Sequence, residues 1–128
     1  MKQNVLKSKS FEFAVSVTNC CRDLIERREY VLSKQLLRSG TSIGANVRES
    51  TYATTRRDFL YKLYVALQEC NETMFWLELL NASRYLEHKT FIGLHQSANE
   101  LLKILSSITK TLRENPSLEK RDLSDPNS

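Results

Sequence analysis

The chain has 128 residues, a net charge of +4 and a hydrophobic fraction of 41%, values typical of one soluble globular domain. No apolar run approaches the roughly 18 residues of a membrane span, and the polar N-terminus lacks the apolar core of a secretory signal. Of the three cysteines, Cys20 and Cys21 are adjacent and Cys70 is left over, a poor arrangement for disulfides. We therefore expect a cytoplasmic protein with reduced, buried thiols and no membrane partner.

The chain opens with a polar, basic lead at residues 1–9, and the first helix is predicted over residues 10–28. Apolar residues recur there with helical spacing, and polar residues point the other way. The side chains expected to face the core are Phe13, Ala14, Val17, Cys20, Cys21, Leu24 and Ile25.

A second helix is predicted over residues 32–52, although it contains two glycines. Each glycine inside a helix costs about 1 kcal/mol relative to alanine. Gly40 and Gly44 are four residues apart, which indicates a neighbouring helix that approaches the backbone closely. The core stripe is expected to comprise Leu36, Gly40, Ile43 and Val47.

The third predicted helix, residues 56–81, is apolar on two faces. Thr55 followed by Asp58 matches a capping box at its start. A helix that is apolar on two faces has to be covered on both, so we expect the bundle to assemble further. One face carries Leu63, Leu67, Cys70, Met74 and Leu77, and the other carries Tyr61, Val65, Phe75, Trp76 and Leu79.

Thr90 is the predicted cap of the last helix, which ends near residues 112–114 where Pro116 approaches. Short polar connections make successive helices antiparallel. The predicted fold is therefore all-α, an antiparallel up-down-up-down four-helix bundle over residues 10–114, followed by a disordered polar tail at residues 115–128. The seam of the last helix, with steps of three and four, is Phe91, Leu94, Ala98, Leu101, Leu105, Ile108 and Leu112.

The residues that could carry chemistry do not form a recognisable catalytic pattern. Di-iron bundles place a glutamate three residues before a histidine, and neither His88 nor His95 has one there. The cysteines lie on apolar stripes, and no catalytic sequence motif occurs. We therefore expect no metal site, no cofactor and no enzymatic activity.

Acidic and apolar residues share the second face of the third helix. Glu69 and Glu72 lie there beside Trp76, either as a solvated acidic face or as part of a subunit interface. In the second case Trp76 would be an anchor and one carboxylate would pair with a basic residue across the interface. The predicted interface residues are Tyr61, Val65, Glu69, Glu72, Trp76 and Leu79.

Basic residues gather around the turn between the second and third helices. Residues 34–62 hold six basic and two acidic side chains, whereas residues 63–128 are slightly acidic. Lysine and arginine can neutralise phosphates, and Tyr52 and Tyr61 could stack on unpaired bases. The alternative is an ordinary solvated helix end. The candidate nucleic-acid-binding residues are Arg38, Arg48, Arg56, Arg57 and Lys62.

Residues 32–49, which read LSKQLLRSGTSIGANVRE, resemble the signature of a bacterial family, the 23S rRNA intervening-sequence proteins. The resemblance covers about residues 10–113 and implies a homopentameric four-helix bundle with a nucleic-acid or ribonucleoprotein role. A similar bundle is the accessory variability protein of diversity-generating retroelements, which works beside a reverse transcriptase. The family supplies no catalytic residues. Further matching positions are Asp58, Phe59, Leu63, Ala66, Leu67, Glu69, Glu72, Thr73, Trp76 and Leu77.

These observations favour a non-enzymatic, cytoplasmic homo-oligomer, a pentamer by resemblance, that binds structured RNA or another nucleic acid through clustered arginine and lysine. The alternative is a protein-interaction scaffold, for example an accessory subunit of a polymerase or reverse transcriptase, whose basic surface docks an acidic partner.

Overall fold

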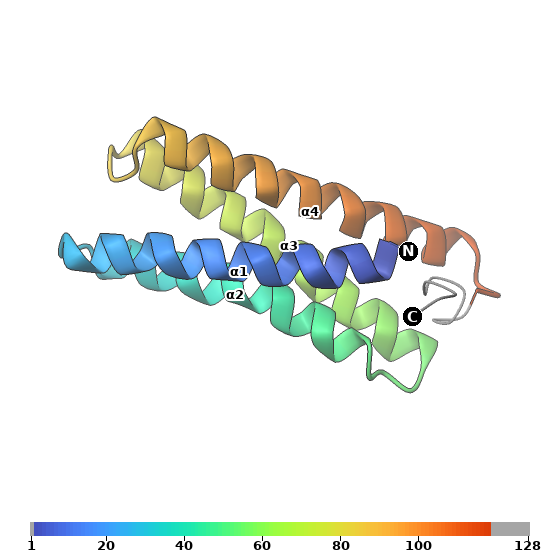
Figure 1. Cartoon of the computed structure of the whole chain (residues 1–128). Helices are drawn as coiled ribbons and strands as arrows, with labels where there is room; N and C mark the ends of the chain where they lie inside the picture. The colour runs from blue at the N-terminus through green and yellow to red at the C-terminus, as the bar shows by residue number, and fades with distance from the viewer. Residues whose placement is uncertain (1, 119–128) are drawn as a thin grey trace.

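The computed structural model describes residues 2–118 and consists of four long helices packed side by side (Figure 1). The predicted all-α four-helix bundle is confirmed, and Figure 1 shows each helix running back along the one before it. Beyond residue 118 the predicted tail lies outside the described residues. The helices are α1 (Lys2–Glu26), α2 (Val31–Ser50), α3 (Arg56–Ala82) and α4 (His88–Glu114).

Helix α1 begins at Lys2, so the predicted lead at residues 1–9 is wrong. Leu6 lies seven residues before Phe13 and is fully buried, and Gln3 and Ser10 are buried on the same face. The heptad spacing of the core thus continues to the start of the chain, with polar residues at two of its positions. Ile25, predicted in the core, is 45% exposed instead.

The core is a continuous seam of residues from all four helices. The stripe predicted on α2 is buried, and on α4 it is buried from Leu94 to Leu112, whereas Phe91 is only partly buried. On α3 the buried face differs from the predicted stripe, because Leu67 and Met74 are only partly buried at the edge of the core. The residues that α3 buries are Phe59, Leu63, Ala66, Cys70, Thr73, Leu77 and Leu80.

Helices α1 and α2 are in close contact at Gly40 and Gly44 of α2. A Cβ atom on Gly40 would lie 2.8 Å from Cγ1 of Val17, and one on Gly44 would lie 3.2 Å from the carbonyl oxygen of Ser10. The predicted close approach of a neighbouring helix is therefore confirmed, and α1 is that helix.

The ends of the helices differ in how they are capped. Thr55 Oγ1 accepts a hydrogen bond from the backbone N–H of Asp58 at 3.1 Å, which confirms the predicted cap of α3. Thr90, the predicted cap of α4, lies inside the helix. Glu87 is the N-cap residue, because its extended backbone ends the turn there and its carbonyl accepts from the N–H of Phe91 at 3.0 Å.

Glu29 caps the start of α2, a role that was not predicted from the sequence. Its buried carboxylate accepts from the backbone N–H groups of Val31, Leu32 and Ser33 at 3.2, 3.0 and 2.7 Å. Burial alone would raise the pKa of Glu29, but these amides favour the charged form and hold its pKa below the ordinary 4.5. The carboxylate thus satisfies the amides that a helix start leaves open.

Glu29→Gln should lower the free energy of unfolding at neutral pH by about 1 kcal/mol, because its NH₂ group cannot accept from an amide. A lowered pKa stabilises the fold above the unfolded-state value, and this stabilisation disappears as the pH falls through the folded-state value. The difference between Glu29→Gln and the parent should therefore shrink below pH 4.5. Urea unfolding across pH, with the exposed Glu26→Gln as control, would measure it; a pH-independent difference would contradict this role.

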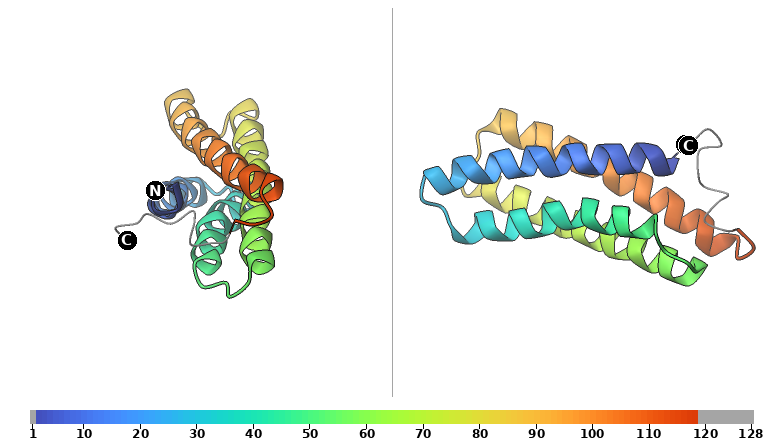
Figure 2. Two further views of the ribbon diagram at one scale, coloured as in Figure 1. Left: turned by 90° about the vertical axis from the view of Figure 1, so that its right-hand side faces the viewer. Right: turned by 60° about the horizontal axis from the view of Figure 1, so that its bottom comes forward.

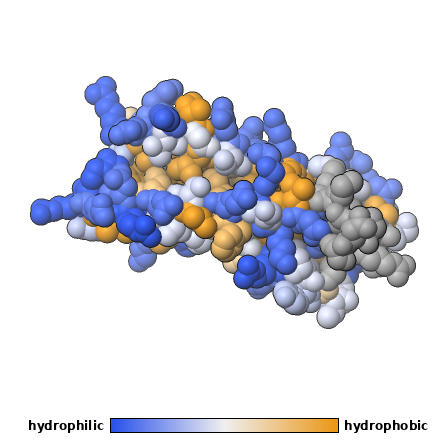
Figure 3. All heavy atoms as spheres, in the orientation of Figure 1, coloured by the Kyte–Doolittle hydropathy of each residue, from blue (hydrophilic) through white to orange (hydrophobic). Residues whose placement is uncertain are grey.

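A groove separates α1 from α4 near the α3–α4 turn, where α4 diverges from α1 (Figure 2). Its volume is about 890 Å³, and Cys20, Leu86 and Leu94 are among the residues that line it. Figure 3 shows hydrophobic atoms on the floor of this hollow and hydrophilic side chains around it. Within residues 2–118, the helices are not apolar enough over a sufficient length to cross a membrane.

Candidate nucleic-acid interface

The five predicted basic residues fall into two groups. Arg38, Arg56 and Lys62 are bonded to other parts of the same chain. Arg48 and Arg57 are exposed, and among residues 2–118 their side chains form no ion pair. The structure thus distinguishes cations that already have a partner within the chain from cations that are open to a ligand.

Arg38 belongs to a network that joins α2 to the outer face of α3. Its guanidinium donates to Glu69 at 3.1 Å and also to Glu72, and the indole N–H of Trp76 donates to the same Glu72 oxygen at 2.8 Å. Both carboxylates that might have paired across a subunit interface therefore have a partner within the chain. Beneath this network, the Thr73 hydroxyl donates to Ser39 Oγ at 2.9 Å.

Arg56 holds the end of α4 against the start of α3. Its side chain is half-buried, and it donates to the carbonyl of Leu118 at 3.1 Å and to the carbonyl of Leu112. The last carbonyls of a helix lack partners within the helix, and a cation near them also interacts favourably with the helix dipole. Arg56 is thus a structural residue, although it stands in the predicted basic cluster.

Arg56→Ala should lower the free energy of unfolding by about 1–3 kcal/mol, because it removes two charge-assisted hydrogen bonds. The neighbouring Arg57→Ala is a matched control, since Arg57 is exposed, and it should change stability by less than about 0.5 kcal/mol. Chemical denaturation of both variants would measure the difference. Equal stabilities would show that Arg56 does not hold the end of α4.

Lys62 pairs with Glu49 of α2 at 3.0 Å. The glutamate side chain is 57% exposed, and exposed pairs of this kind contribute less than about 1 kcal/mol. The ammonium group of Lys62 can therefore exchange its partner for a phosphate at little cost.

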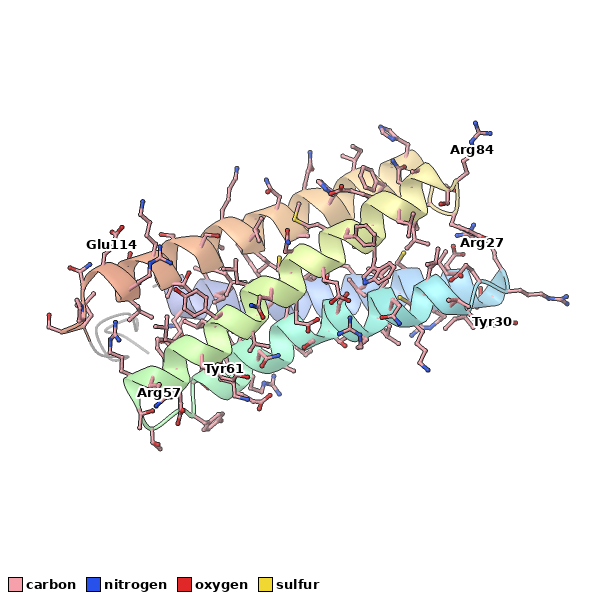
Figure 4. The ribbon with its side chains drawn as sticks, turned by 180° about the vertical axis from the view of Figure 1, so that it is seen from behind. Arg27, Tyr30, Arg57, Tyr61, Arg84 and Glu114 are labelled. Carbon is pink, nitrogen blue, oxygen red and sulfur yellow. The ribbon has the colours of Figure 1, made fainter. Side chains whose placement is uncertain are left out.

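Arg48 and Arg57 lie on either side of the α2–α3 turn, together with two exposed tyrosines. Arg48 is in the last turn of α2, and Arg57 is in the first turn of α3. Tyr52 is 78% exposed and Tyr61 is 63% exposed. Figure 4 shows Arg57 and Tyr61 at one end of the bundle, with Arg27 at the other. Open cations and exposed aromatic rings therefore share the α2–α3 end.

The outer face of α3 holds the predicted interface residues in a mixed surface. Tyr61 is exposed, whereas Val65, Trp76 and Leu79 are half-buried. Phe75, which the predicted interface set left out, is 56% exposed and packs edge-on against Trp76 with ring centroids 5.0 Å apart. Exposed aromatic surface on this scale is typical of a contact with another molecule.

The thiols and histidines do not assemble into a reactive centre within the described part of the chain. No group of three or more metal-ligating side chains occurs among residues 2–118, and His95 pairs with Glu78 at 3.0 Å. Burial raises the pKa of both Cys21 and Cys70 to about 12 and also raises that of Cys20. All three cysteines are buried and free, so they are protonated at neutral pH and weak nucleophiles.

Comparison with known proteins places the chain in a family. Residues 2–107 match the family described as 23S rRNA-intervening sequence protein. The fold is similar to the crystal structure of a protein with unknown function from the S23 ribosomal protein family of Bacteroides thetaiotaomicron VPI-5482. The sequences are 50% identical, the TM-score is 0.84, and the match covers 86% of this chain and 99% of that one. No curated protein matches the chain. This four-helix bundle therefore belongs to the 23S rRNA-intervening sequence protein family.

Proposed function

We propose that this protein is a non-enzymatic, cytoplasmic homo-oligomer that binds structured RNA through the α2–α3 end of the bundle. The observation that carries the proposal is the pair of open cations there: Arg48 and Arg57 are exposed and have no ion pair among residues 2–118. Lys62 adds a third cation whose partner is exposed and exchangeable. Arginine and lysine bind RNA largely by neutralising phosphates.

The oligomer is proposed on the two-faced character of α3. Its inner face fills the core, while Tyr61 and Phe75 stay exposed on its outer face. A second copy that covers these rings would remove them from water, and the resemblance to the family suggests a ring of five chains. A ring would also repeat Arg48 and Arg57 in every subunit, which multiplies a modest net charge of +4 per chain.

The double variant Arg48→Glu/Arg57→Glu tests the RNA site. We expect its affinity for a structured 23S rRNA fragment to fall about tenfold or more, since each reversal replaces a phosphate contact with a repulsion. Lys103→Glu/Lys110→Glu makes the same charge change on exposed positions of α4 and should weaken binding much less. Fluorescence anisotropy with both variants would measure the effect. Equal losses would indicate a response to net charge alone and would contradict this site.

The groove between α1 and α4 favours a second function, a scaffold for another protein. Its volume of about 890 Å³ and its mixed lining, in which Cys20, Leu86 and Leu94 lie among polar side chains that include Asp23 and Glu87, suit an amphipathic partner helix better than a nucleic acid. A specific protein that co-purifies without RNA, and that is lost when Gly93 in this groove is replaced by tryptophan, would favour the scaffold.

A further inference from the structure

Phe11 is an exposed aromatic residue on the side of α1 that faces away from the core. Its side chain is 59% exposed. It lines two neighbouring hollows of about 410 and 440 Å³ between α1 and α2. Lys7 and Arg48 line both hollows with it, so the aromatic ring is flanked by a cation from each helix.

The first hollow, of about 410 Å³, lies where α1 packs on small residues of α2. Gly44 and Ala45 line it, and α1 already passes so close that a Cβ on Gly44 would lie 3.2 Å from the Ser10 carbonyl oxygen. Gly44 thus allows the close packing of α1, and Phe11 lines the hollow beside this contact. Asn4 lines the second hollow and supplies an amide that can donate and accept hydrogen bonds.

The charge around Phe11 is suited to an anion. Within residues 2–118 neither the Lys7 ammonium nor the Arg48 guanidinium has an ion pair. Glu49 lines the first hollow and Glu12 lines the second, so each hollow has one carboxylate beside the two cations. The surface therefore keeps positive charge on both sides of an exposed ring.

We propose that Lys7, Phe11 and Arg48 form a binding site for single-stranded nucleic acid, in which one unpaired base stacks on the Phe11 ring and the adjoining phosphates pair with the two cations. This inference rests on the proposed RNA-binding function and deepens it by naming unpaired nucleotides as the part that is bound here. A base inside a duplex cannot present its face to Phe11, so the site selects loops or single strands.

The test compares Phe11→Leu with the parent protein, using a fluorescent single-stranded oligouridine and a blunt RNA duplex as probes. Leucine keeps an apolar side chain but lacks the aromatic face, so affinity for the oligouridine should fall about 5- to 100-fold, the range of losing one base stack. Affinity for the duplex should stay within about twofold. Tyr30→Leu is the matched control, because Tyr30 is also 59% exposed and lies at the other end of the bundle (Figure 4).

The outcomes separate this site from the general function. If Phe11→Leu binds oligouridine like the parent while Arg48→Glu/Arg57→Glu loses RNA, the proposed function stands and the stacking site is overturned. If the parent binds neither probe even at low salt, both fall. A third experiment compares two competitors of equal charge, an oligoglutamate peptide and an oligonucleotide, for their ability to displace oligouridine. If both displace it equally well, the surface binds acidic peptides and the proposed nucleotide site is overturned.

Discussion

Replacing Gly40 with leucine should lower the free energy of unfolding by about 3 kcal/mol, the cost of forcing a large side chain into a filled space. Even a Cβ atom at this position would lie 2.8 Å from Cγ1 of Val17 and 3.0 Å from its Cγ2. Val17 is fully buried and branched at Cβ, so its rotamer cannot move aside. Urea denaturation at a fixed protein concentration would measure the loss.

Gly93→Ala is the matched control for Gly40, because a Cβ at Gly93 meets nothing within 4 Å. Alanine is the better helix former, so this change should raise stability by about 0.5–1 kcal/mol. Val17→Ala placed beside Gly40→Ala should recover part of the stability that Gly40→Ala alone loses. If Gly40→Leu were as stable as the parent, α1 and α2 could not pack as closely as described.

Tyr61→Glu should reduce the mass of the assembled protein to that of one chain, 14.9 kDa. Tyr61 is 63% exposed, so the change leaves the core of each chain intact, but it would place a charge inside the proposed contact. Trp76→Glu is less selective, because the Trp76 indole donates to Glu72 and packs against the core. Light scattering coupled to size-exclusion chromatography would measure the mass.

Tyr30→Glu controls for the added charge in this experiment, because Tyr30 is similarly exposed but lies at the opposite end of the bundle. The control should keep the parent's mass. A parent protein with the mass of one chain, or a Tyr61→Glu variant that stays assembled, would contradict the proposed contact on α3.

The helices and most of the core could be predicted because apolar residues recur at steps of three and four. The prediction was wrong where polar residues occupy core positions or where additional apolar residues obscure the spacing. Gln3 and Ser10 occupy core positions near the N-terminus, so a polar sequence concealed two turns of α1. On α3, apolar residues flank the buried face on both sides. The exact orientation of that face could not be predicted, because the small or polar Ala66 and Thr73 are buried while the bulkier Leu67 and Met74 lie at the edge of the core.

The candidate site was harder to predict, because its character depends on residues far apart in the sequence. The sequence shows that basic residues lie near the α2–α3 turn, but it does not show which residues they bind in the folded chain. Arg38 pairs with Glu69 and Glu72, which lie 31 and 34 residues later, and Arg56 binds Leu112, 56 residues later. Glu29 offered a weak local signal: it is a glutamate two residues before α2, and the first backbone N–H groups of that helix donate to its carboxylate.

The surface around Phe11 could not be anticipated because it needs two helices. Lys7 lay in the segment predicted as a lead, and Arg48 follows it by 41 positions in the printed sequence. Only the packing of α1 on the glycines of α2 brings the two cations to the same hollows.

RNA recognition by the α2–α3 end is tested most directly by the affinity of the parent protein for a structured 23S rRNA fragment between about 50 and 200 mM salt. Phosphate neutralisation predicts that log affinity falls steeply and linearly with log salt, and that Arg48→Glu/Arg57→Glu flattens the slope. Absence of binding at the lowest salt, or a slope that this variant leaves unchanged, would contradict RNA recognition by the α2–α3 end.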